Sequence, residues 1–120
     1  MAFKFEQLEV WQLALDYVDL IYEIANRLPR SEEFNLKSQL VRAATSIALN
    51  IAEGSTGQTD AEQARFLGMA LRSLVETVAC QHLIRRRSLV SEEYLLDQAY
   101  RQAEMLAMKL QAMKKAITKR

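Results

Sequence analysis

Glycine, proline and cysteine are scarce in this chain. Its 120 residues include three glycines, one proline and one cysteine. So few residues that favour turns argue against a β-sandwich and in favour of long helices. The single cysteine, Cys80, cannot form an internal disulfide, and its apolar neighbours predict a buried, unreactive thiol. A free thiol fits a reducing compartment.

Long hydrophobic runs are also missing. No apolar stretch is long enough to span a bilayer, and the first residues lack the apolar core of a signal peptide. We therefore expect a cytoplasmic protein that makes no use of a membrane.

Residues that could carry enzyme chemistry are few. The one histidine, His82, has no nucleophile and orienting group in a recognisable pattern around it, so we expect it to be structural or on the surface. Clustered metal ligands, the Glu-x-x-His pairs of di-iron bundles and a glycine-rich phosphate loop are all absent from the sequence. The sequence thus predicts no catalytic site, no metal, no cofactor and no evident small-molecule substrate.

Good helix formers dominate what is present, and they fall into four segments. We predict helices over about residues 6–27, 36–53, 59–87 and 91–118, within one domain that spans residues 1–120. Short connectors between helices of this length predict an all-α protein, an antiparallel up-down-up-down four-helix bundle.

Local signals set the ends of these helices. Pro29 stops the first helix, and Gly54 offers the left-handed conformation that ends the second. Thr59 and Glu62 have the spacing of a reciprocal capping box at the start of the third helix, and Ser91 is expected to cap the fourth. Gly68, inside the third helix, predicts a close helix–helix contact.

The first helix carries two apolar stripes separated by a polar seam. One stripe comprises Leu8, Trp11, Leu15, Val18, Tyr22 and Ala25, and the other Val10, Ala14, Tyr17, Ile21, Ile24 and Leu28. The seam consists of Glu9, Gln12, Asp16, Asp19, Glu23 and Asn26. Either the core face of this helix is wide, or the helix also lines a subunit interface. We favour the interface because an exposed apolar patch of that size would be a liability.

The second helix has an apolar face and an unusual polar stripe. The stripe and the glycine that follows it are Gln39, Arg42, Ser46, Asn50, Glu53 and Gly54. Polar groups on so apolar a helix need partners. An internal network that fixes helix register or a subunit contact is the favoured explanation, and contact with a ligand or nucleic acid is the alternative. The third helix presents an inner seam of Ala64, Leu67, Leu71, Leu74, Val78 and Gln81.

The net charge of +1 conceals an asymmetry along the chain. Residues 1–33 carry seven acids and three bases, whereas the remainder carries eight acids and thirteen bases. The clustered bases, which are our candidates for contacts with RNA or DNA, are Arg85, Arg86, Arg87, Lys109, Lys114, Lys115, Lys119 and Arg120. Such clusters could bind a polyanion, guide like subunits together, or be ordinary solvated charge that also complements helix ends.

Taken together, the motifs resemble one known family, the 23S ribosomal RNA intervening-sequence proteins, also called S23. The likeness rests on Leu8-x-x-Trp11-Gln12-x-Ala14, Leu28-Pro29 with Glu33-Phe34 and Leu36, Gln39-x-x-Arg42-Ala43-Ala44-x-Ser46-Ile47-x-x-Asn50-Ile51-Ala52-Glu53-Gly54, and Phe66-Leu67 through Ser73-Leu74-x-Glu76. Ala48 stands where the family often has proline, and Arg72 where it often has glycine. The family is also similar to the accessory proteins of diversity-generating retroelements.

The resemblance implies a bundle that assembles into a pentameric ring. Our first hypothesis is accordingly a non-enzymatic, ring-forming homo-oligomer that binds RNA or DNA through its basic surfaces. The alternative is a structural or protein-interaction scaffold without nucleic-acid binding, in which the charge asymmetry serves assembly.

Overall fold

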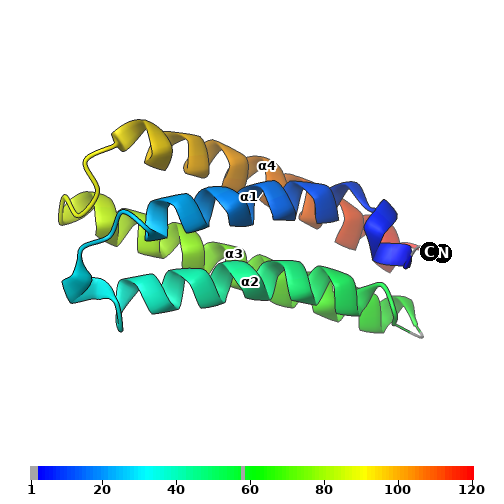
Figure 1. Cartoon of the computed structure of the whole chain (residues 1–120). Coiled ribbons are helices and arrows are strands. Elements are labelled where there is room, and N and C mark those ends of the chain that lie inside the picture. Colours follow the sequence, from blue (N-terminus) through cyan, green and yellow to red (C-terminus); the bar gives the residue numbers. More distant parts are fainter. Residues whose placement is uncertain (1–2, 58) are drawn as a thin grey trace.

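Four long helices pack side by side in the computed structural model, which describes residues 3–57 and 59–120 (Figure 1). They are α1 (Glu9–Ala25), α2 (Leu36–Gly54), α3 (Asp60–Arg86) and α4 (Glu93–Thr118). Short 3-10 helices, η1 (Lys4–Gln7) and η2 (Arg30–Glu32), precede α1 and α2. Successive long helices run in opposite directions, so both termini lie at the same end of the bundle (Figure 1). The predicted four-helix bundle is confirmed.

Each helix contacts two neighbours, in the order α1, α2, α3, α4 and back to α1. The face formed by α1 and α2 therefore lies opposite the face formed by α3 and α4. Of the helices in the described part of the chain, none is both long enough and apolar enough to cross a membrane.

Only one of the two apolar stripes of α1 forms the core. The buried stripe consists of Val10, Ala14, Tyr17, Ile21, Ile24 and Leu28. In the other stripe, Ala25 is buried and Leu8, Trp11 and Val18 are half-buried, whereas Leu15 and Tyr22 are exposed. The polar seam between the stripes is exposed throughout.

The first helix is shorter than predicted at both ends. Leu8 has an extended backbone and separates η1 from α1, which begins at Glu9 rather than residue 6. The Phe5 ring packs edge-on against Trp11, with ring centroids 4.6 Å apart, and this contact holds η1 against the side of α1. The helix ends at Ala25 rather than residue 27, because the N–H groups of Arg27 and Leu28 bond carbonyls three residues back and tighten the turn before Pro29.

The predicted left-handed end of α2 at Gly54 is wrong. Gly54 is the last residue of the helix and does not have a positive φ angle. Its lack of a side chain serves a close approach instead, because a Cβ atom at this position would lie 2.8 Å from the Cβ of Phe66 on α3. The left-handed residue is Ser88, which follows α3 with φ 52°. There Leu89 N–H bonds the Ile84 carbonyl at 3.1 Å, the pattern of a Schellman cap.

The starts of α3 and α4 differ in how well the sequence predicted them. Thr59 caps α3 as expected, its hydroxyl accepting from the backbone N–H of Glu62 at 3.0 Å. The prediction that Ser91 caps α4 is wrong. Its hydroxyl donates to the neighbouring Glu92 carboxylate at 3.1 Å, its carbonyl accepts the N–H of Glu93, and Glu92 occupies the capping position.

Gly68 is not the site of a close contact between helix backbones. A Cβ atom there would meet the Lys114 side chain of α4, at 3.2 Å from Nζ and 3.8 Å from Cε. The glycine thus leaves room for a long cationic side chain to lie across α3.

Candidate functional site

Part of the polar stripe of α2 forms a hydrogen-bond network that joins α2 to α3. The Asn50 amide donates to the carbonyl and the hydroxyl of Ser46, at 2.9 and 3.0 Å. The Ser73 hydroxyl on α3 donates to the Ser46 hydroxyl at 2.9 Å. The three side chains are half-buried. Because the Ser73–Ser46 bond links fixed positions on two helices, it favours one register of α2 against α3.

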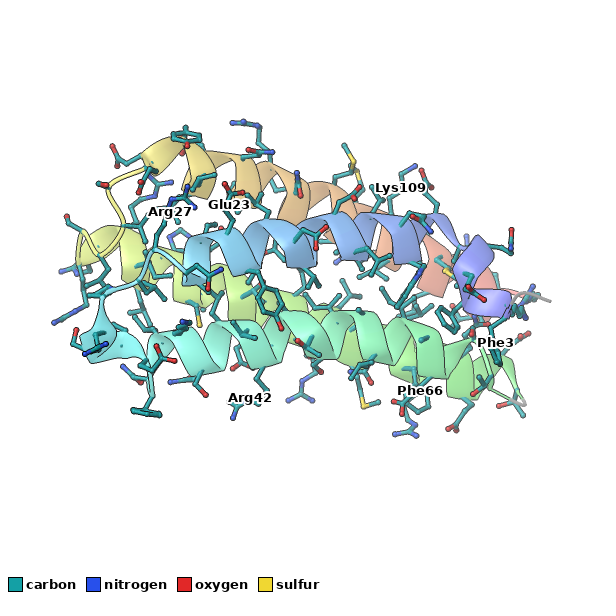
Figure 2. The ribbon with its side chains drawn as sticks, viewed as in Figure 1. Phe3, Glu23, Arg27, Arg42, Phe66 and Lys109 are labelled. Atoms are coloured by element: carbon teal, nitrogen blue, oxygen red, sulfur yellow. The ribbon has the colours of Figure 1, made fainter. Side chains whose placement is uncertain are left out.

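Of the other polar members of the stripe, Gln39 is half-buried, whereas Arg42 and Glu53 are exposed. Gln39 donates to Asn35 at 3.0 Å, one turn earlier. Arg42 lies 4.0 Å from Glu76 of α3 and is largely solvent-exposed (Figure 2), so this ion pair is loose. Glu53 is exposed at the end of the helix. The stripe is therefore divided into a structural centre and exposed flanks.

Several candidate cations are held by acidic side chains of neighbouring helices. Arg85 donates to Asp97 at 2.9 Å and to Glu93 at 3.3 Å, which ties the end of α3 to the start of α4. Lys109 of α4 lies 3.3 Å from Glu9 of α1 (Figure 2). These charges are already partly neutralised.

Near the C-terminus, Arg120 is paired with an acid in the same way, whereas Lys114 is not. Arg120 donates from two nitrogens to the Asp60 carboxylate, at 3.0 and 3.2 Å, and so joins the end of the chain to the start of α3. The half-buried Lys114 lies across Gly68, as described above. Of the basic residues proposed from the sequence, five make no ion pair with any described residue: Arg86, Arg87, Lys114, Lys115 and Lys119.

The remaining cations fall into two groups that are far apart. Arg86 and Arg87 lie where α3 ends, and Lys115 and Lys119 lie where α4 ends. Because α3 and α4 are antiparallel, the groups sit at opposite ends of a bundle 45 Å long (Figure 1). They do not merge into one basic patch on a single copy of the chain.

A chain of buried hydroxyl and amide groups crosses the core between α1 and α3. The Gln81 amide bonds the Tyr17 hydroxyl at 2.6 Å, which bonds the Thr77 hydroxyl at 2.8 Å. Thr77 in turn donates to the Leu74 carbonyl at 2.6 Å. Burial is the main cause that raises the pKa of Tyr17 to about 12, so the phenol stays neutral and keeps its proton for this chain.

The proton inventory fixes the direction of every bond in this chain. The Thr77 hydroxyl donates its one proton to the Leu74 carbonyl, so Tyr17 is the donor to Thr77. The Tyr17 oxygen then accepts from the NH2 group of Gln81. The Gln81 Oε1 atom is left as an acceptor, buried and without a hydrogen-bond partner among the described residues. An unsatisfied buried acceptor costs about 1–3 kcal/mol.

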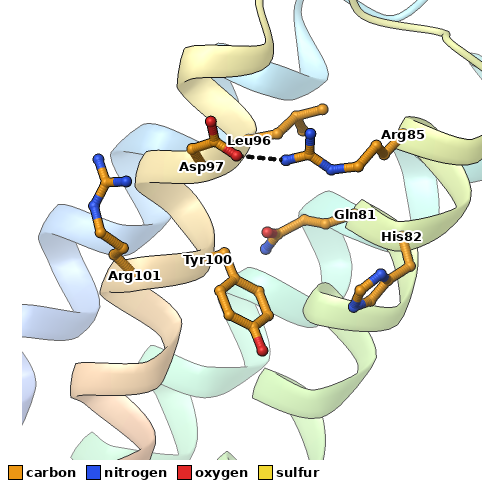
Figure 3. A pocket seen from close by; sticks show the side chains of 7 residues that line it. All are labelled: Gln81, His82, Arg85, Leu96, Asp97, Tyr100 and Arg101. Atoms are coloured by element: carbon orange, nitrogen blue, oxygen red, sulfur yellow. Dashed lines mark hydrogen bonds and ion pairs between the residues drawn. The ribbon is translucent and has the colours of Figure 1, made fainter.

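Gln81 also lines a pocket between the end of α3 and the start of α4. The pocket has a volume of about 350 Å³ and is lined by Gln81, His82, Arg85, Leu96, Asp97, Tyr100 and Arg101 (Figure 3). The Gln81 side chain points from α3 toward α4, with the Arg85–Asp97 ion pair on one side and the Tyr100 ring on the other (Figure 3). We call this hollow the Gln81 pocket.

His82 and Cys80, the two side chains with reactive potential, lie in different surroundings. His82 is exposed and meets the edge of Tyr100, with ring centroids 6.2 Å apart. Cys80 is buried, as predicted, and burial followed by the negative charge of Glu76 raises its pKa. A raised pKa disfavours the thiolate, so this thiol is a poor nucleophile. Within residues 3–57 and 59–120, no three His, Cys, Asp or Glu side chains gather as metal ligands would.

Exposed apolar side chains border hollows on two opposite faces of the bundle. On the α1/α2 face, Tyr22, Phe34 and Val41 border a hollow of about 440 Å³, and Phe34 is 96% exposed. Opposite it, α3 and α4 form an apolar groove of about 480 Å³, in which Val75 is 67% exposed. The floor and sides of the groove are formed by Leu71, Leu74, Val78, Tyr100, Ala103 and Ala107.

The sequence comparison identifies the family of this bundle. A family model described as 23S rRNA-intervening sequence protein matches residues 6–116. The chain belongs to this family. The family resemblance predicted from the motifs of α1, α2 and α3 is thereby confirmed.

A solved structure from the same family shares the fold. It is the crystal structure of a protein of unknown function from the S23 ribosomal protein family of Bacteroides thetaiotaomicron VPI-5482. The two chains superpose with a TM-score of 0.80 at 24% identity, over 88% of this chain and 98% of that chain. No curated protein matches the chain. The similarity to retroelement accessory proteins is not supported by these comparisons and stays a prediction.

Sequence reasoning missed the Gln81 pocket. It placed Gln81 on the inner seam of the third helix, where it is indeed buried, but treated it as part of an apolar stripe. The available signal was chemical, because Tyr17 and Gln81 carry polar groups at seam positions that otherwise hold aliphatic residues.

Proposed function

We propose that this intervening-sequence family member is a non-enzymatic scaffold that assembles from copies of itself. The α1/α2 face of one copy packs into the α3/α4 groove of the next. The observation that carries the proposal is the presence of two exposed apolar surfaces on opposite sides of the bundle. Surfaces of this kind mark interaction sites because water disfavours large contiguous apolar patches.

The charges of the two faces support a contact between unlike surfaces. Together, α1 and α2 contain five acids and two bases, and Asp16, Asp19 and Glu23 are exposed on α1. Together, α3 and α4 contain eight bases and six acids, with Arg72 beside the groove. An acidic face opposite a basic one favours a head-to-tail arrangement over a symmetric pairing of identical faces.

A head-to-tail contact forms a closed ring whenever its rotation closes. Since the two faces lie on opposite sides of the bundle, each copy can bind two neighbours at once. Five copies is the number that the family resemblance favours.

Light-scattering mass after gel filtration tests this proposal. We expect a particle several times the 13.8 kDa mass of one chain, and five times that mass for a pentamer. Replacing Val75 with Glu should lower the mass, because it places a charge in the apolar groove. A wild-type protein that stays monomeric at tens of micromolar concentration would refute the proposal.

Leu83→Glu is the matched control. Leu83 also lies on α3 and is 49% exposed, but it borders a hollow on the α2 side of the helix. The same substitution there should leave the mass unchanged. An equal loss of mass in both variants would point to damage to the fold rather than to the groove.

A second candidate function, binding of RNA or DNA, is favoured by the cations without ion-pair partners at the two ends of the bundle. In a ring of parallel bundles, Arg86 and Arg87 of every copy would gather on one rim, and Lys115 and Lys119 on the other. Repetition would then turn a modest charge per chain into a multivalent surface for phosphates.

Fluorescence anisotropy with structured ribosomal RNA and random duplex DNA, at low and physiological salt, tests this candidate. Binding through phosphates should weaken steeply as salt rises. Lys115→Gln/Lys119→Gln should reduce both affinity and salt dependence, whereas Arg30→Gln/Arg65→Gln removes the same charge elsewhere and should have less effect. Absence of binding at low salt by a well-formed oligomer would eliminate the candidate and leave the scaffold role alone.

A further inference from the structure

We propose that Asp19 of one copy forms an ion pair with Arg101 of the next copy, and that this pair selects a parallel arrangement of neighbouring bundles. The inference rests on the proposed self-assembly and names the charge contact that orients it. It follows from two exposed charges that have no partner within the chain, from the helix faces that carry them, and from their height along the bundle.

Asp19 stands within the exposed apolar stripe of α1. Leu15, Asp19 and Tyr22 follow one another at spacings of four and three, so they share one face of the helix. Leu15 and Tyr22 are exposed, and Tyr22 lines the hollow on the α1/α2 face. Asp19 is also exposed and makes no ion pair with any described residue. A second copy that covers this stripe therefore meets an acid that still lacks a cation.

Arg101 occupies a corresponding position on α4. It borders the α3/α4 face, since the adjacent Tyr100 lines the apolar groove, and its side chain points away from Gln81 (Figure 3). Arg101 makes no ion pair with any described residue. The exposed Met105 and Met108 follow it at spacings of four and three. Each helix thus carries a stripe of one free charge and two exposed apolar side chains, and the two charges are opposite.

The two charges lie at the same height along the bundle. Two ion pairs, each at 3.3 Å, fix which residues of α1 and α4 lie side by side: Glu9 with Lys109, and Arg27 with Glu92. Counted from the first pair, Asp19 lies about 15 Å and Arg101 about 12 Å along its helix, at about 1.5 Å per residue. Counted from the second pair, the values are about 12 and 14 Å. The heights of Asp19 and Arg101 therefore agree to within about 3 Å, which the arginine side chain can span.

A parallel neighbour brings the two charges together. The helices follow the order α1, α2, α3, α4 around the bundle. When the α1/α2 face of one bundle packs on the α3/α4 face of a parallel copy, α1 lies beside α4 and α2 beside α3. Rotation about a ring axis along the bundles keeps every height, so Asp19 arrives level with Arg101. An antiparallel neighbour would place α1 beside α3 instead and would separate the pair.

Two other acids near this contact do not compete for the same role. Asp16 lies at nearly the height of Asp19, but it follows Glu9 by two helical turns and so shares the side of α1 on which Glu9 contacts α4 of its own chain. Glu104, which lines the groove, is level with residues 13–15 of a parallel neighbour, a segment without charge. The parallel contact therefore juxtaposes one acid with one base and brings no acid against Glu104.

Charge reversal with rescue tests the pair. Light-scattering mass over a dilution series gives the concentration at which half of the oligomer dissociates. Arg101→Glu and Asp19→Arg should each raise that concentration about tenfold, because each places like charges together. The double variant Arg101→Glu/Asp19→Arg restores opposite charges and should return to within about threefold of wild type. Wild-type dissociation in both single variants, or a double variant as weak as either single one, would overturn the proposal.

Asp16 provides the matched control. Arg101→Glu/Asp16→Arg has the same net charge as the rescued variant, but it should remain as weak as Arg101→Glu alone. Equal rescue by Asp16→Arg would attribute the effect to overall charge and overturn the pair. Circular dichroism checks that each variant is helical. If a reversed variant does not fold, the milder Arg101→Gln and Asp19→Asn form a double-mutant cycle, in which additive effects on dissociation would likewise overturn the pair.

The two proposals fail in different ways. A monomeric wild type removes self-assembly and the pair with it. A wild-type oligomer that Val75→Glu dissociates, but that charge reversal at Asp19 and Arg101 leaves intact, would retain self-assembly and overturn the pair alone.

Discussion

Replacing Gly54 with Ala should destabilise the protein, although it introduces a better helix former. In most helices this change is favourable, because glycine loses more backbone freedom on folding than alanine does. Gly54 is the last residue of α2 and packs directly on α3. The added methyl group would lie 2.8 Å from the Cβ of Phe66, which is fixed to the backbone and cannot swing away.

The size of the effect follows from two opposing contributions. Helix propensity offers at most about 1 kcal/mol in favour of alanine. Overpacking a well-packed contact costs about 1–3 kcal/mol. We therefore expect a net loss of up to about 2 kcal/mol in the free energy of unfolding, despite the gain in propensity.

Gly68→Ala is the matched control, because its surroundings predict the opposite sign. A Cβ atom at Gly68 would meet only the flexible end of Lys114, at 3.2 Å. That side chain can move, so the variant should gain up to about 1 kcal/mol. Urea denaturation followed by circular dichroism, at one protein concentration, measures both variants. Equal stabilisation by the two substitutions would refute the argument from close approach.

Three further changes test the hydrogen bonds and ion pairs. Tyr17→Phe should lower the free energy of unfolding by about 1–3 kcal/mol in urea denaturation, because the buried Gln81 amide loses its acceptor. Stability should fall as pH rises from about 10, the ordinary pKa of tyrosine, to about 12, the pKa of Tyr17 in the fold, because the unfolded chain loses this proton first. Tyr17→Phe should remove that part of the slope, and an unchanged slope would contradict the assignment. Asp60→Asn should cost no more than about 1 kcal/mol, since the ion pair with Arg120 is exposed; a double-mutant cycle with Arg120→Gln measures the coupling.

The helices themselves could be predicted because their causes are local. The apolar positions of α2 repeat at helical spacing, and Leu40, Ile47 and Ile51 are all buried as that spacing requires. Thr59 caps α3 because the hydroxyl and the N–H that it accepts lie three residues apart in the sequence. Features of this kind need no knowledge of the neighbouring helices.

Contacts between helices could not be predicted from the same patterns. Gly54 has the position of a left-handed cap, but the approach of Phe66 decides its role. The Gln81 pocket depends on Tyr17, which lies 64 residues earlier in the chain. Helical periodicity assigns both residues to the core without showing that their polar ends meet. The hydrogen bonds among Tyr17, Thr77 and Gln81, which leave Gln81 Oε1 without a donor, can be seen only in the folded structure.

The net charge of +1 hides how the charged side chains are distributed over the bundle, and this distribution bears on the proposed assembly. Some of the cations along the bundle are paired with acids on adjacent helices, as Lys109 is with Glu9 and Arg85 is with Asp97. Such pairing reduces the repulsion that would oppose close contact between the sides of neighbouring bundles. Arg86, Arg87, Lys115 and Lys119 make no ion pair among the described residues and lie at the two ends of the bundle, whereas Arg72, which makes none either, borders the apolar groove. Assembly through the sides of the bundle and nucleic-acid binding through its ends would therefore use separate surfaces. Val75→Glu should impair assembly directly, and binding only because fewer copies remain in the ring. Lys115→Gln/Lys119→Gln should impair binding directly.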